Sequence, residues 1–450
     1  MTYIEIPEKA ERILKVLHDN GYEAYVVGGC VRDSVLGRTP GDWDITTSAS
    51  PEQVKLLFPK TIDTGIQHGT VTVMDGKEGF EVTTYRIDGV YEDCRHPKEV
   101  TFTNSLYEDL RRRDFTINAM AYAPGTGLVD EFGGMEDLKN KVIRCVGDAR
   151  ERFSEDALRM LRAVRFAAQL GFSLADDVKT AIREMADALD YVSAERIQTE
   201  LVKLLMSPRP HWFRLAYECG ITSVIMPEFD RIMVQRQNNP HHIYTTGEHT
   251  LVALQNCPPQ RMLRLTMLFH DMGKPEVFTT DENGKDHFRG HAAHSEVIAR
   301  RILKRLKFDN ETVDTVCNLV RNHSWYPLLT GKDVRCCAYQ MGPELFDSFL
   351  LVKRSDIMAH HPDVIVQKLD YLKEVEHIWR DVQLHRDCLS LKELALTGRD
   401  LLADGMEPGP AVGEVLQKLL AEVLEFPERN MHEYLMNRSR TLRESAEAAD

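Results

Sequence analysis

The sequence predicts an α+β amino-terminal part followed by an all-helical remainder. Up to about residue 150, short apolar runs bounded by glycines and turn residues alternate with helical patterns. From Ser154 onward, apolar residues recur almost throughout at helical spacing. A chain of 450 residues is long enough for roughly two to four domains, each with its own core. We therefore expect domains at 1–150, 151–215, 216–380 and 381–450, the first with a small mixed sheet and the others helical.

The first elements have clear local signals. Apolar residues three or four apart at 10–17 predict a helix that Gly21 ends. The apolar run 24–27 predicts a short buried strand that leads into the glycine pair 28–29. Because Gly28 and Gly29 have no side chains, this turn allows a backbone to approach another group closely.

Further along, two elements are delimited by turn and capping residues. Ser50 followed by Pro51 is typical of a helix start, and the helix is expected to run through Leu57. Residues 70–74 and 80–85 predict a β-hairpin around an Asp-Gly-Lys turn. Beyond the α+β part, Ser154 is expected to cap a long helix that Gly171 ends.

The composition is that of an ordinary globular protein without a membrane-spanning segment. No run approaches the roughly 18 apolar residues that a membrane helix requires, and the first residues lack the features of a signal peptide. The nine cysteines are scattered without zinc spacing, so we expect reduced thiols in a cytoplasmic protein. The net charge of −14 argues against indiscriminate nucleic-acid binding but is compatible with a local basic face.

A glycine pair followed by two aspartates is the most informative motif. Asp42 and Asp44 come shortly after Gly28-Gly29, a turn suited to phosphate. If residues 43–46 form a strand, the two aspartates point to the same face, about 7 Å apart along it. Two such carboxylates can bind a hard cation, which suggests metal-dependent phosphoryl or nucleotidyl transfer. The alternative interpretation is a turn rich in aspartate.

Glu81 is the candidate for a third carboxylate. It lies in the second strand of the predicted hairpin, and a sheet that places this strand beside Asp42 and Asp44 would bring the three groups together. Three carboxylates suffice to hold two Mg²⁺ ions, which would activate an attacking hydroxyl and hold a triphosphate. The alternative is an exposed strand residue without a function.

Two arginine-rich segments suit phosphate and base recognition. The run 111–113 matches the oxygens of a triphosphate or an RNA backbone, because guanidinium groups bind phosphate bidentately; the alternative is a solvated charge run. On a helix, Asp156 and Arg159 would be neighbours, with Arg162 and Arg165 on nearly the same side. The simplest interpretation is a surface ion pair.

The functional interpretation of Asp156 and Arg159 is selection of a nucleobase. A carboxylate acceptor beside a guanidinium donor matches the amino group and ring nitrogen of cytosine and of adenine. Uracil and guanine present the opposite order and would leave both protein groups with the wrong partner, which costs selectivity. Such a pair would select CTP and ATP without a template.

Together these motifs resemble those of the class II tRNA nucleotidyltransferases, or CCA-adding enzymes. This family belongs to the polymerase-β-like superfamily, which also contains bacterial poly(A) polymerases. The resemblance rests on residues 27–33, 41–44, 112–118 and 155–159, in that order and spacing. It implies a polymerase-β-like nucleotidyltransferase head, followed by a helical neck, body and tail, with tRNA bound along the inner face.

The resemblance also implies roles for individual residues. Asp42 and Asp44 would hold Mg²⁺ and, with Glu81, form the catalytic group. The residues that it assigns to nucleotide binding are Gly28, Gly29, Arg32, Arg113, Asp114, Asn118, Asp156, Arg159, Arg162 and Arg165.

Two further segments gain an interpretation from the same family. Members that add adenosine keep a flexible loop between the hairpin and the arginine cluster, and residues 88–97 resemble that loop. This favours addition of the full CCA over addition of CC alone. The tail, including residues 397–400, is expected to contact the tRNA elbow by resemblance only.

A second constellation, centred on His270 and Asp271, resembles the HD superfamily of metal-dependent phosphohydrolases. His249 upstream and Asp356 downstream complete the superfamily's order of ligands, and His291 and His323 are candidates for a second metal. Imidazole and carboxylate together suit Mn²⁺, Ni²⁺ or Zn²⁺, and one carboxylate can bridge two ions. The expected substrates are phosphomonoesters or 2′,3′-cyclic phosphates.

Not every histidine of this region is expected to bind metal, and not every HD domain is active. His241, His242 and His294 are interpreted as ordinary surface or core residues. Degenerate HD domains persist as scaffolds, so the domain has two interpretations: an active hydrolase and a structural module.

The sequence therefore predicts an Mg²⁺-dependent, template-independent enzyme that builds or repairs the 3′-CCA of tRNA. Its partners would be CTP, ATP and the 3′ end and elbow of tRNA, with no membrane. Its state would be a monomer or a homodimer. The nearest alternative is a poly(A) polymerase or A-adding enzyme, because the base-reading pair accepts adenine as well as cytosine. Two others are an HD hydrolase with a degenerate head and a non-catalytic RNA-holding protein.

Overall fold

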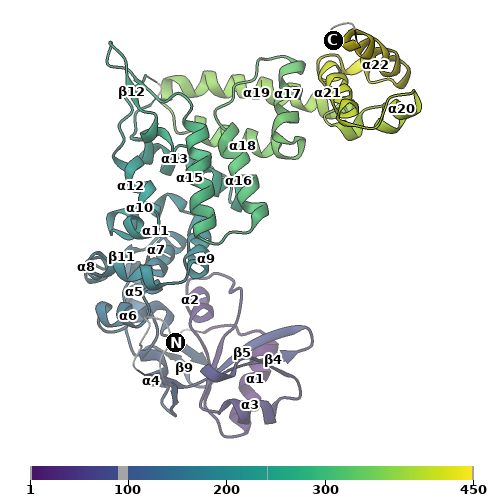
Figure 1. The fold of residues 1–450 in the computed structure, drawn as a ribbon. Coiled ribbons are helices and arrows are strands. Elements are labelled where there is room, and N and C mark those ends of the chain that lie inside the picture. Colours follow the sequence, from purple (N-terminus) through teal and green to yellow (C-terminus); the bar gives the residue numbers. More distant parts are fainter. Residues whose placement is uncertain (1–2, 90–99, 241, 448–450) are drawn as a thin grey trace. The chain divides into compact units, whose positions relative to one another are not determined.

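The computed structural model describes residues 3–89, 100–240 and 242–447. The chain divides into two compact units, 1–230 and 231–450. Figure 1 shows the larger sheet in the purple to blue amino-terminal part, whereas the green and yellow parts consist almost entirely of helices. The predicted α+β class is confirmed. The finer division into four domains stays a prediction.

A seven-stranded mixed sheet forms the centre of the first unit. Its strand order is β3–β4–β5–β2–β1–β8–β9, and β2 and β5 are its one parallel pair among the described strands. The strands are β1 (Ala24–Val27), β2 (Ile45–Thr47), β3 (Thr61–Gly65), β4 (Thr70–Asp75), β5 (Glu78–Thr84), β8 (Ala121–Ala123) and β9 (Gly127–Val129). Two-stranded sheets pair β6 (Arg86–Asp88) with β7 (Val100–Phe102) and β10 (Val142–Ile143) with β11 (Ser173–Leu174).

The predicted hairpin is confirmed as β4 and β5, joined through Gly76 in the left-handed conformation, which glycine adopts at little cost. The predicted strand at 43–46 is shorter than expected, because β2 begins only at Ile45. Aspartate has a low preference for strands, and Asp44 contributes just a carbonyl, which accepts a hydrogen bond from the amide of Val27. The predicted loop 88–97 lies almost wholly outside the described residues.

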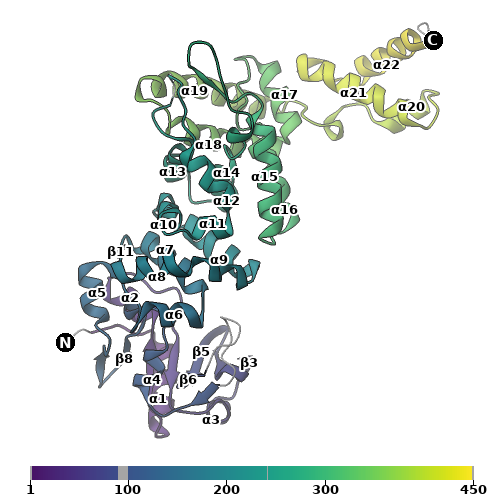
Figure 2. The same ribbon diagram turned by 60° about the vertical axis from the view of Figure 1, so that its left-hand side comes forward.

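Helices cover the sheet, and further helices follow it along the chain (Figure 2). The first helix ends at Asp19, before Gly21, as predicted, and Ser50 caps the third helix in a capping box with Gln53. The helices are α1 (Glu8–Asp19), α2 (Gly29–Val35), α3 (Pro51–Leu57), α4 (Leu106–Arg111), α5 (Gly134–Asn140), α6 (Ala149–Glu155), α7 (Leu158–Leu170), α8 (Asp176–Met185), α9 (Ala194–Leu205), α10 (Phe213–Glu218), α11 (Ile221–Ile225) and α12 (Pro227–Val234).

The helix predicted to start at Ser154 is in fact two helices. Ser154 lies in the last turn of α6, which Asp148 caps, and α7 begins at Leu158 and ends at Gly171. Asp156 lies between them in an extended conformation, and its side chain accepts a hydrogen bond from the amide of Leu158. Aspartate side chains that bond to nearby backbone in this way compete with the helix. The expectation that Asp156 and Arg159 share a helix is therefore wrong.

The second unit is built from helices and one two-stranded sheet, β12 (Thr279–Thr280) with β13 (Asp286–His287). The helices are α13 (Thr246–Asn256), α14 (Arg261–Phe269), α15 (His291–Arg305), α16 (Asn310–Asn322), α17 (Gly331–Met341), α18 (Phe346–Ile357), α19 (Pro362–His385), α20 (Gly398–Ala403), α21 (Pro410–Glu425) and α22 (His432–Glu447). One apolar cluster of this unit runs from α17, α18 and α19 to α21. Among the described residues, no helix has the length and apolar character needed to cross a membrane.

Candidate active site and metal centre

Three carboxylates lie near one another beside the middle strands of the sheet in the first unit. Asp44 directly precedes β2, and Glu81 lies on β5, where Val82 is paired with Ile45. Burial, followed by the negative charges of Asp42 and Glu81, raises the pKa of Asp44 to about 6. The parallel pairing of β2 and β5 therefore places Asp44 next to Glu81, and the charge of Asp42 also acts on Asp44. The side chains of Asp42 and Glu81 are exposed.

This donor set fits a hard divalent cation such as Mg²⁺. All three side chains offer carboxylate oxygens, the ligands that Mg²⁺ prefers. Burial and, after it, the negative charges of Asp42 and Glu81 raise the pKa of Asp44, and the one described group that opposes this rise is the guanidinium of Arg113. A divalent cation would relieve the repulsion between these charges, so the carboxylate cluster is suited to binding one.

The glycine loop makes room for Arg113. Strand β1 ends at Val27, Gly28 has a φ of 82°, and α2 begins at Gly29. A Cβ atom at Gly28 would lie 3.2 Å from a terminal nitrogen of Arg113. Arg113 is itself held by Asp109, a wholly buried carboxylate on α4, at 3.3 Å. The loop therefore combines strained backbone, which favours glycine, with a guanidinium beside the carboxylate cluster.

A chain of buried polar contacts links α2 to α7. Arg32 donates to the side-chain oxygen of Asn118 at 2.7 Å, and Asn118 donates to Asp114 at 3.1 Å. Arg162 on α7 donates twice to the other oxygen of Asp114, at 2.6 and 3.0 Å. Burial alone would raise the pKa of Asp114, but Arg162 and Asn118 outweigh it and lower the pKa to about 2. Because Asp114 is already fully engaged, it is suited to holding Arg162 in place.

Asp156 and Arg159 are each held by a charged neighbour. Arg196 on α9 forms a two-pronged ion pair with Asp156, at 2.7 and 3.1 Å. Arg159 is paired with Glu155 at 2.5 Å and donates to the backbone carbonyl of Arg112. Both predicted base-reading groups are therefore fixed in the same unit as the carboxylate cluster.

Sequence reasoning missed two partners on α9. Arg165 is bound to Glu200 at 2.5 Å, and both side chains are almost completely buried. Glu200 has a signal in the sequence, because a charged residue lies there among Ile197, Leu201 and Leu204 on the apolar helix face. Arg196 lacks such a signal, because its pairing with Asp156 depends on the break between α6 and α7.

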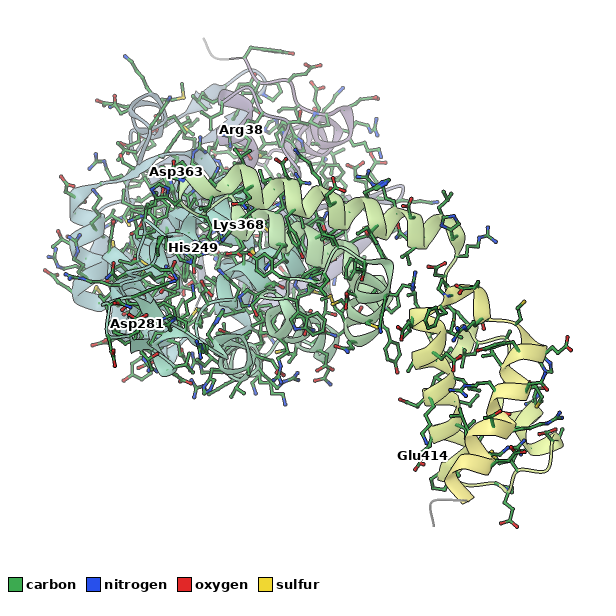
Figure 3. All side chains as sticks on the ribbon, turned by 90° about the horizontal axis from the view of Figure 1, so that it is seen from above. Arg38, His249, Asp281, Asp363, Lys368 and Glu414 are labelled. Atoms are coloured by element: carbon green, nitrogen blue, oxygen red, sulfur yellow. The ribbon has the colours of Figure 1, made fainter. Side chains whose placement is uncertain are left out.

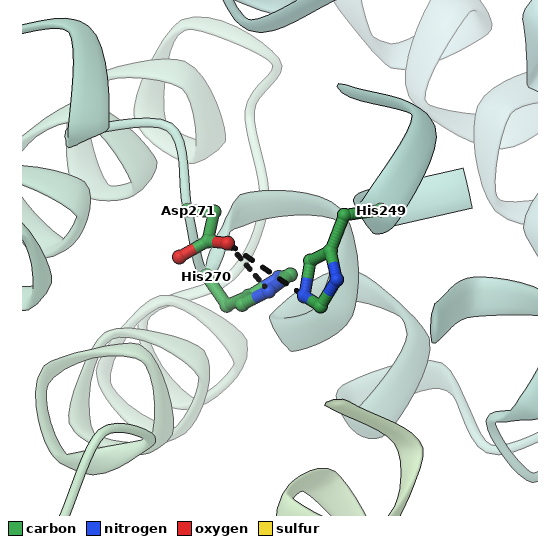
Figure 4. Close-up of side chains that lie close together, drawn as sticks. All are labelled: His249, His270 and Asp271. Carbon is green, nitrogen blue, oxygen red and sulfur yellow. Dashed lines mark ion pairs between the residues drawn. The ribbon is translucent and has the colours of Figure 1, made fainter. Parts of the chain in front are cut away.

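The second unit contains a buried cluster of histidines and aspartates. The side chains of His249, His270 and Asp271 are turned toward one another (Figure 4). Two groups have ligand atoms within 4.8 Å of one another, one formed by these three residues and the other by Asp271, His291 and His323. Asp271 belongs to both groups, so its carboxylate is placed to bridge two ions.

The remaining predicted ligand also lies at this cluster. One oxygen of Asp356 is 2.9 Å from Nε2 of His249 and 3.8 Å from Nε2 of His270. In the second group, the Nε2 atoms of His291 and His323 are 3.1 Å apart. The structure therefore brings together all six predicted ligands.

All four histidines are oriented in the same way. In each, Nδ1 lies at hydrogen-bond distance from a backbone carbonyl: Ala359 for His249, Met267 for His270, Phe288 for His291 and Val320 for His323. A carbonyl can only accept, so Nδ1 carries the proton and Nε2 has a free lone pair in the neutral ring. This is the arrangement in which metal-binding histidines are held.

One atom of the cluster lacks a well-formed hydrogen bond. Nε2 of His270 is buried and has no hydrogen-bond partner among the described residues, although Oδ2 of Asp271 lies 3.2 Å away. Unpaired polar atoms are costly in the interior unless something else satisfies them. A divalent ion bound by imidazole nitrogen and carboxylate oxygen would do so, and the cluster thus fits a transition metal.

Charges around the cluster hold its carboxylates ionised. Burial acts to raise the pKa of Asp271, but His270 and Lys274 outweigh it and hold the pKa well below its usual range. Lys274 lies 2.6 Å from the carboxylate. Of the histidines interpreted as ordinary, His294 is exposed and pairs with Glu276, whereas the ring of His242 packs against His249. His241 lies outside the described residues.

Comparison with protein families matches three segments of the chain. Residues 24–144 match the poly A polymerase head domain, and residues 171–233 match the "Probable RNA and SrmB-binding site of polymerase A". Residues 280–438 match domain 2 of the tRNA nucleotidyltransferases. The matched head domain contains Asp42, Asp44 and Glu81.

Relatives match over nearly the whole chain. The CCA-adding enzyme of Levilactobacillus brevis is 36% identical over 427 residues, 93% of each chain, and that of Enterococcus faecalis is 34% identical over 454 residues, 98% of each. The crystal structure of the Bacillus stearothermophilus CCA-adding enzyme in complex with CTP is 30% identical, with a TM-score of 0.71 over 98% of this chain and 100% of that one. The chain therefore belongs to the CCA-adding enzymes, a family of nucleotidyltransferases whose head domain is that of the poly A polymerases.

Proposed function

We propose that this protein adds or restores the 3′-terminal CCA of tRNA, using CTP and ATP and releasing pyrophosphate, without a nucleic-acid template. The observation that carries the proposal is the carboxylate cluster of Asp42, Asp44 and Glu81 in one unit with Asp156 and Arg159. Sequence identity of 34–36% to CCA-adding enzymes over almost the full chain supports it.

The reaction joins an RNA 3′-hydroxyl to the α-phosphate of the incoming nucleotide and breaks the bond between its α- and β-phosphates. Asp42 and Asp44 would hold Mg²⁺, with Glu81 assisting; bound Mg²⁺ lowers the pKa of a hydroxyl and neutralises phosphate charge. Arg32 and Arg113 bind phosphate oxygens of the triphosphate. The glycine loop, which includes Gly28 and Gly29, lets the backbone approach them closely.

Base selection is assigned to Asp156 and Arg159, which offer an acceptor and a donor to cytosine or adenine. Their neighbours restrict the directions in which these groups can point, because Arg196 holds Asp156 and Glu155 holds Arg159. We assign positioning roles to a further set, whose polar atoms are already engaged with one another: Asp114, Asn118, Arg162, Arg165 and Glu200.

The tRNA and the compartment are inferred on separate grounds. A CCA-adding enzyme of Thermotoga maritima with the same fold was solved in complex with tRNA, which supports tRNA as the acceptor. The tail around residues 397–400 is assigned to the elbow by resemblance. The described cysteines are all unpaired, which fits the reducing cytoplasm.

The experiment that tests the proposal supplies CTP and ATP, separately and together, to tRNA transcripts that end before CCA, after C or after CC. Addition of two C residues and then one A, lost in Asp42→Ala, is expected. Growth with ATP alone from all three transcripts would assign the protein to the poly(A) polymerases or A-adding enzymes instead.

We also propose a second activity: the buried cluster of the second unit binds one or two transition-metal ions and hydrolyses phosphate esters. Its ligands would be His249, His270, Asp271, His291, His323 and Asp356. The specific observation in favour is that all four histidines direct Nε2 inward while a backbone carbonyl engages Nδ1. Bound metal of this kind supplies a nucleophilic hydroxide near neutral pH.

Metal analysis and a hydrolysis assay test this second proposal. The purified protein should contain Mn²⁺, Ni²⁺ or Zn²⁺, and should release phosphate from 2′-AMP or open 2′,3′-cyclic AMP. Bound metal without hydrolysis would indicate that this domain is a structural module and not a hydrolase. Neither metal nor hydrolysis after reconstitution with each ion would contradict the proposal.

A further inference from the structure

Arg335 is a buried charged residue that the proposed chemistry does not use. It lies on α17, is 7% exposed, and points to the place where α21 ends (α17 and α21 are labelled in Figures 1 and 2). In Figure 3, the labelled Glu414 lies on α21 and the labelled Lys368 on α19, so both helices can be found there. Burial of a guanidinium is costly unless every donor finds a partner, so its contacts indicate why it is there.

Arg335 joins the ends of two helices to a third. Its Nε donates to the carbonyl of Leu424 at 2.7 Å, and a terminal nitrogen donates to the carbonyl of Glu425 at 3.2 Å. The other terminal nitrogen donates to Asp387, just beyond the end of α19, at 2.8 Å. The last carbonyls of a helix have no partner within it, and a cation is favourable at that end. Arg335 therefore caps α21 from a neighbouring helix.

The hydrogen bonds of Arg335 fix a direction between the helices, which the apolar packing around them does not. Apolar residues of α17 and α21, among them Val334 and Leu420, belong to one cluster, but apolar contacts tolerate sliding. A surface pocket of about 680 Å³ lies beside Arg335 and is lined also by Asp387 and Pro427. A planar guanidinium with three fixed acceptors sets both distance and direction.

Space for this guanidinium is provided by the start of α17. A Cβ atom at Gly331 would lie 3.0 Å from a terminal nitrogen of Arg335, closer than such contacts normally are. A second ion pair spans the same junction, between Lys332 and Glu425 at 2.8 Å, but its side chains are about half exposed. An exposed pair of this kind contributes little, and it offers a matched control.

We propose that Arg335 is a positioning residue for tRNA. It fixes the direction of the tail helices α20, α21 and α22 relative to α17 and α19, so that the tail presents one preformed surface to the tRNA elbow. This rests on the proposed function, in which the tail contacts the elbow. Without the contact, the tail would lose this preorganisation, and tRNA binding would have to restore it.

The test compares Arg335→Met, Arg335→Lys and the control Lys332→Ala on two RNAs that end before CCA. One is a full-length tRNA transcript and the other an acceptor-stem hairpin that lacks the elbow. Arg335→Met should raise both KM and Kd for tRNA about tenfold, with kcat and all hairpin constants unchanged. Arg335→Lys should lie in between, because lysine keeps the charge near Asp387 but has no fork. Lys332→Ala should behave as wild type.

Two results would overturn the proposal. One is an unchanged KM and Kd for tRNA in Arg335→Met. The other is an equal loss of activity and affinity on tRNA and on the hairpin. General unfolding would give that result, and Arg335 would then contribute to stability alone. Wild-type protein that binds tRNA but incorporates neither CTP nor ATP would contradict the proposed function instead, and the Kd values would then decide the role of Arg335.

Discussion

The two candidate metal centres differ in the charge around their carboxylates. In the first unit, burial and then the negative charges of Asp42 and Glu81 raise the pKa of Asp44 to about 6. In the second unit, histidines and Lys274 surround Asp271 and hold its pKa well below the usual range. At the first centre, Arg113 is the one described group that opposes the rise in the pKa of Asp44, whereas at the second Lys274 lies directly against the carboxylate of Asp271.

This difference explains why the centres suit different metals. A cluster of carboxylates beside solvent favours a hard, exchangeable ion such as Mg²⁺, which a triphosphate can bring with it. A buried cluster whose donors are chiefly imidazole nitrogens favours transition metals held more tightly. Loss of the transition metal at the second centre should therefore leave nucleotidyl transfer at the first centre intact, and the reverse.

Removal of a histidine ligand should have the largest effect, a loss of metal affinity, and this loss should be confined to the second centre. His270→Ala deletes a wholly buried donor next to Asp271 and is expected to lower transition-metal affinity on the order of 100-fold or more. CTP incorporation should stay within about twofold of wild type. Metal content by elemental analysis provides the measurement, with exposed His294→Ala as the control; loss of both properties would show that the centres are coupled.

Glu81→Gln should sharpen the assignment of the first centre. The substitution keeps the shape of the side chain but removes one of the charges that raise the pKa of Asp44. We expect kcat for CTP addition to fall on the order of 100-fold, with the metal of the second unit retained. Glu78→Gln on the same strand, an exposed partner of Lys9, should have no effect. Equal kcat values for the two variants would remove Glu81 from the catalytic group.

Arg196→Ala should change selectivity more than rate. Without Arg196, Asp156 loses its two-pronged partner and can turn away from the base. Misincorporation of UTP relative to CTP is expected to rise about tenfold, measured as the ratio of kcat/KM values. Exposed Glu195→Gln on the same helix is the control. An unchanged ratio would mean that Asp156 does not depend on Arg196 for its orientation.

Asp114→Asn should have the smallest effect, on stability. The pKa of Asp114 is lowered from 3.8 to about 2 in the folded chain, so its charge stabilises the fold above pH 3.8, and this stabilisation is lost as pH falls toward 2. The variant should lose about 2 kcal/mol at pH 7. Urea unfolding followed by hydrogen exchange in the first unit tests this, and the difference from wild type should shrink below pH 4.

Exposed Asp63→Asn, which breaks a surface pair with Lys55, provides the comparison for Asp114. It should cost no more than about 1 kcal/mol at any pH. A constant difference between Asp114→Asn and wild type from pH 7 to pH 3 would argue against the ion pair with Arg162 as the source of the stabilisation.

The sequence was most informative where a motif is local. The hairpin, the helix start at Ser50 and the helix ends at Gly21 and Gly171 depend on nearby residues, and the structure contains all of them. It was least informative where a side chain competes with the backbone. Asp156 breaks the predicted helix because it accepts a hydrogen bond from the amide of Leu158, which no periodicity reveals.

Partners that come from a distant helix were also out of reach of the sequence. Arg196 and Arg335 look like ordinary charges on helices, and their roles appear only when Asp156 or the end of α21 is placed beside them. The six proposed ligands of the second unit were found because they follow a known order in the chain. The lysine next to Asp271 was not, since lysine does not bind metals as a cation.

One measurement tests the central claim, that nucleotidyl transfer belongs to the carboxylate centre of the first unit. The double variant Asp42→Ala, Asp44→Ala is assayed for CTP and ATP incorporation into a tRNA transcript that lacks CCA, with the metal content of the second unit determined in the same preparation. We expect incorporation to disappear while the transition metal remains. Incorporation at the wild-type rate would contradict the account and make the histidine centre the principal enzyme.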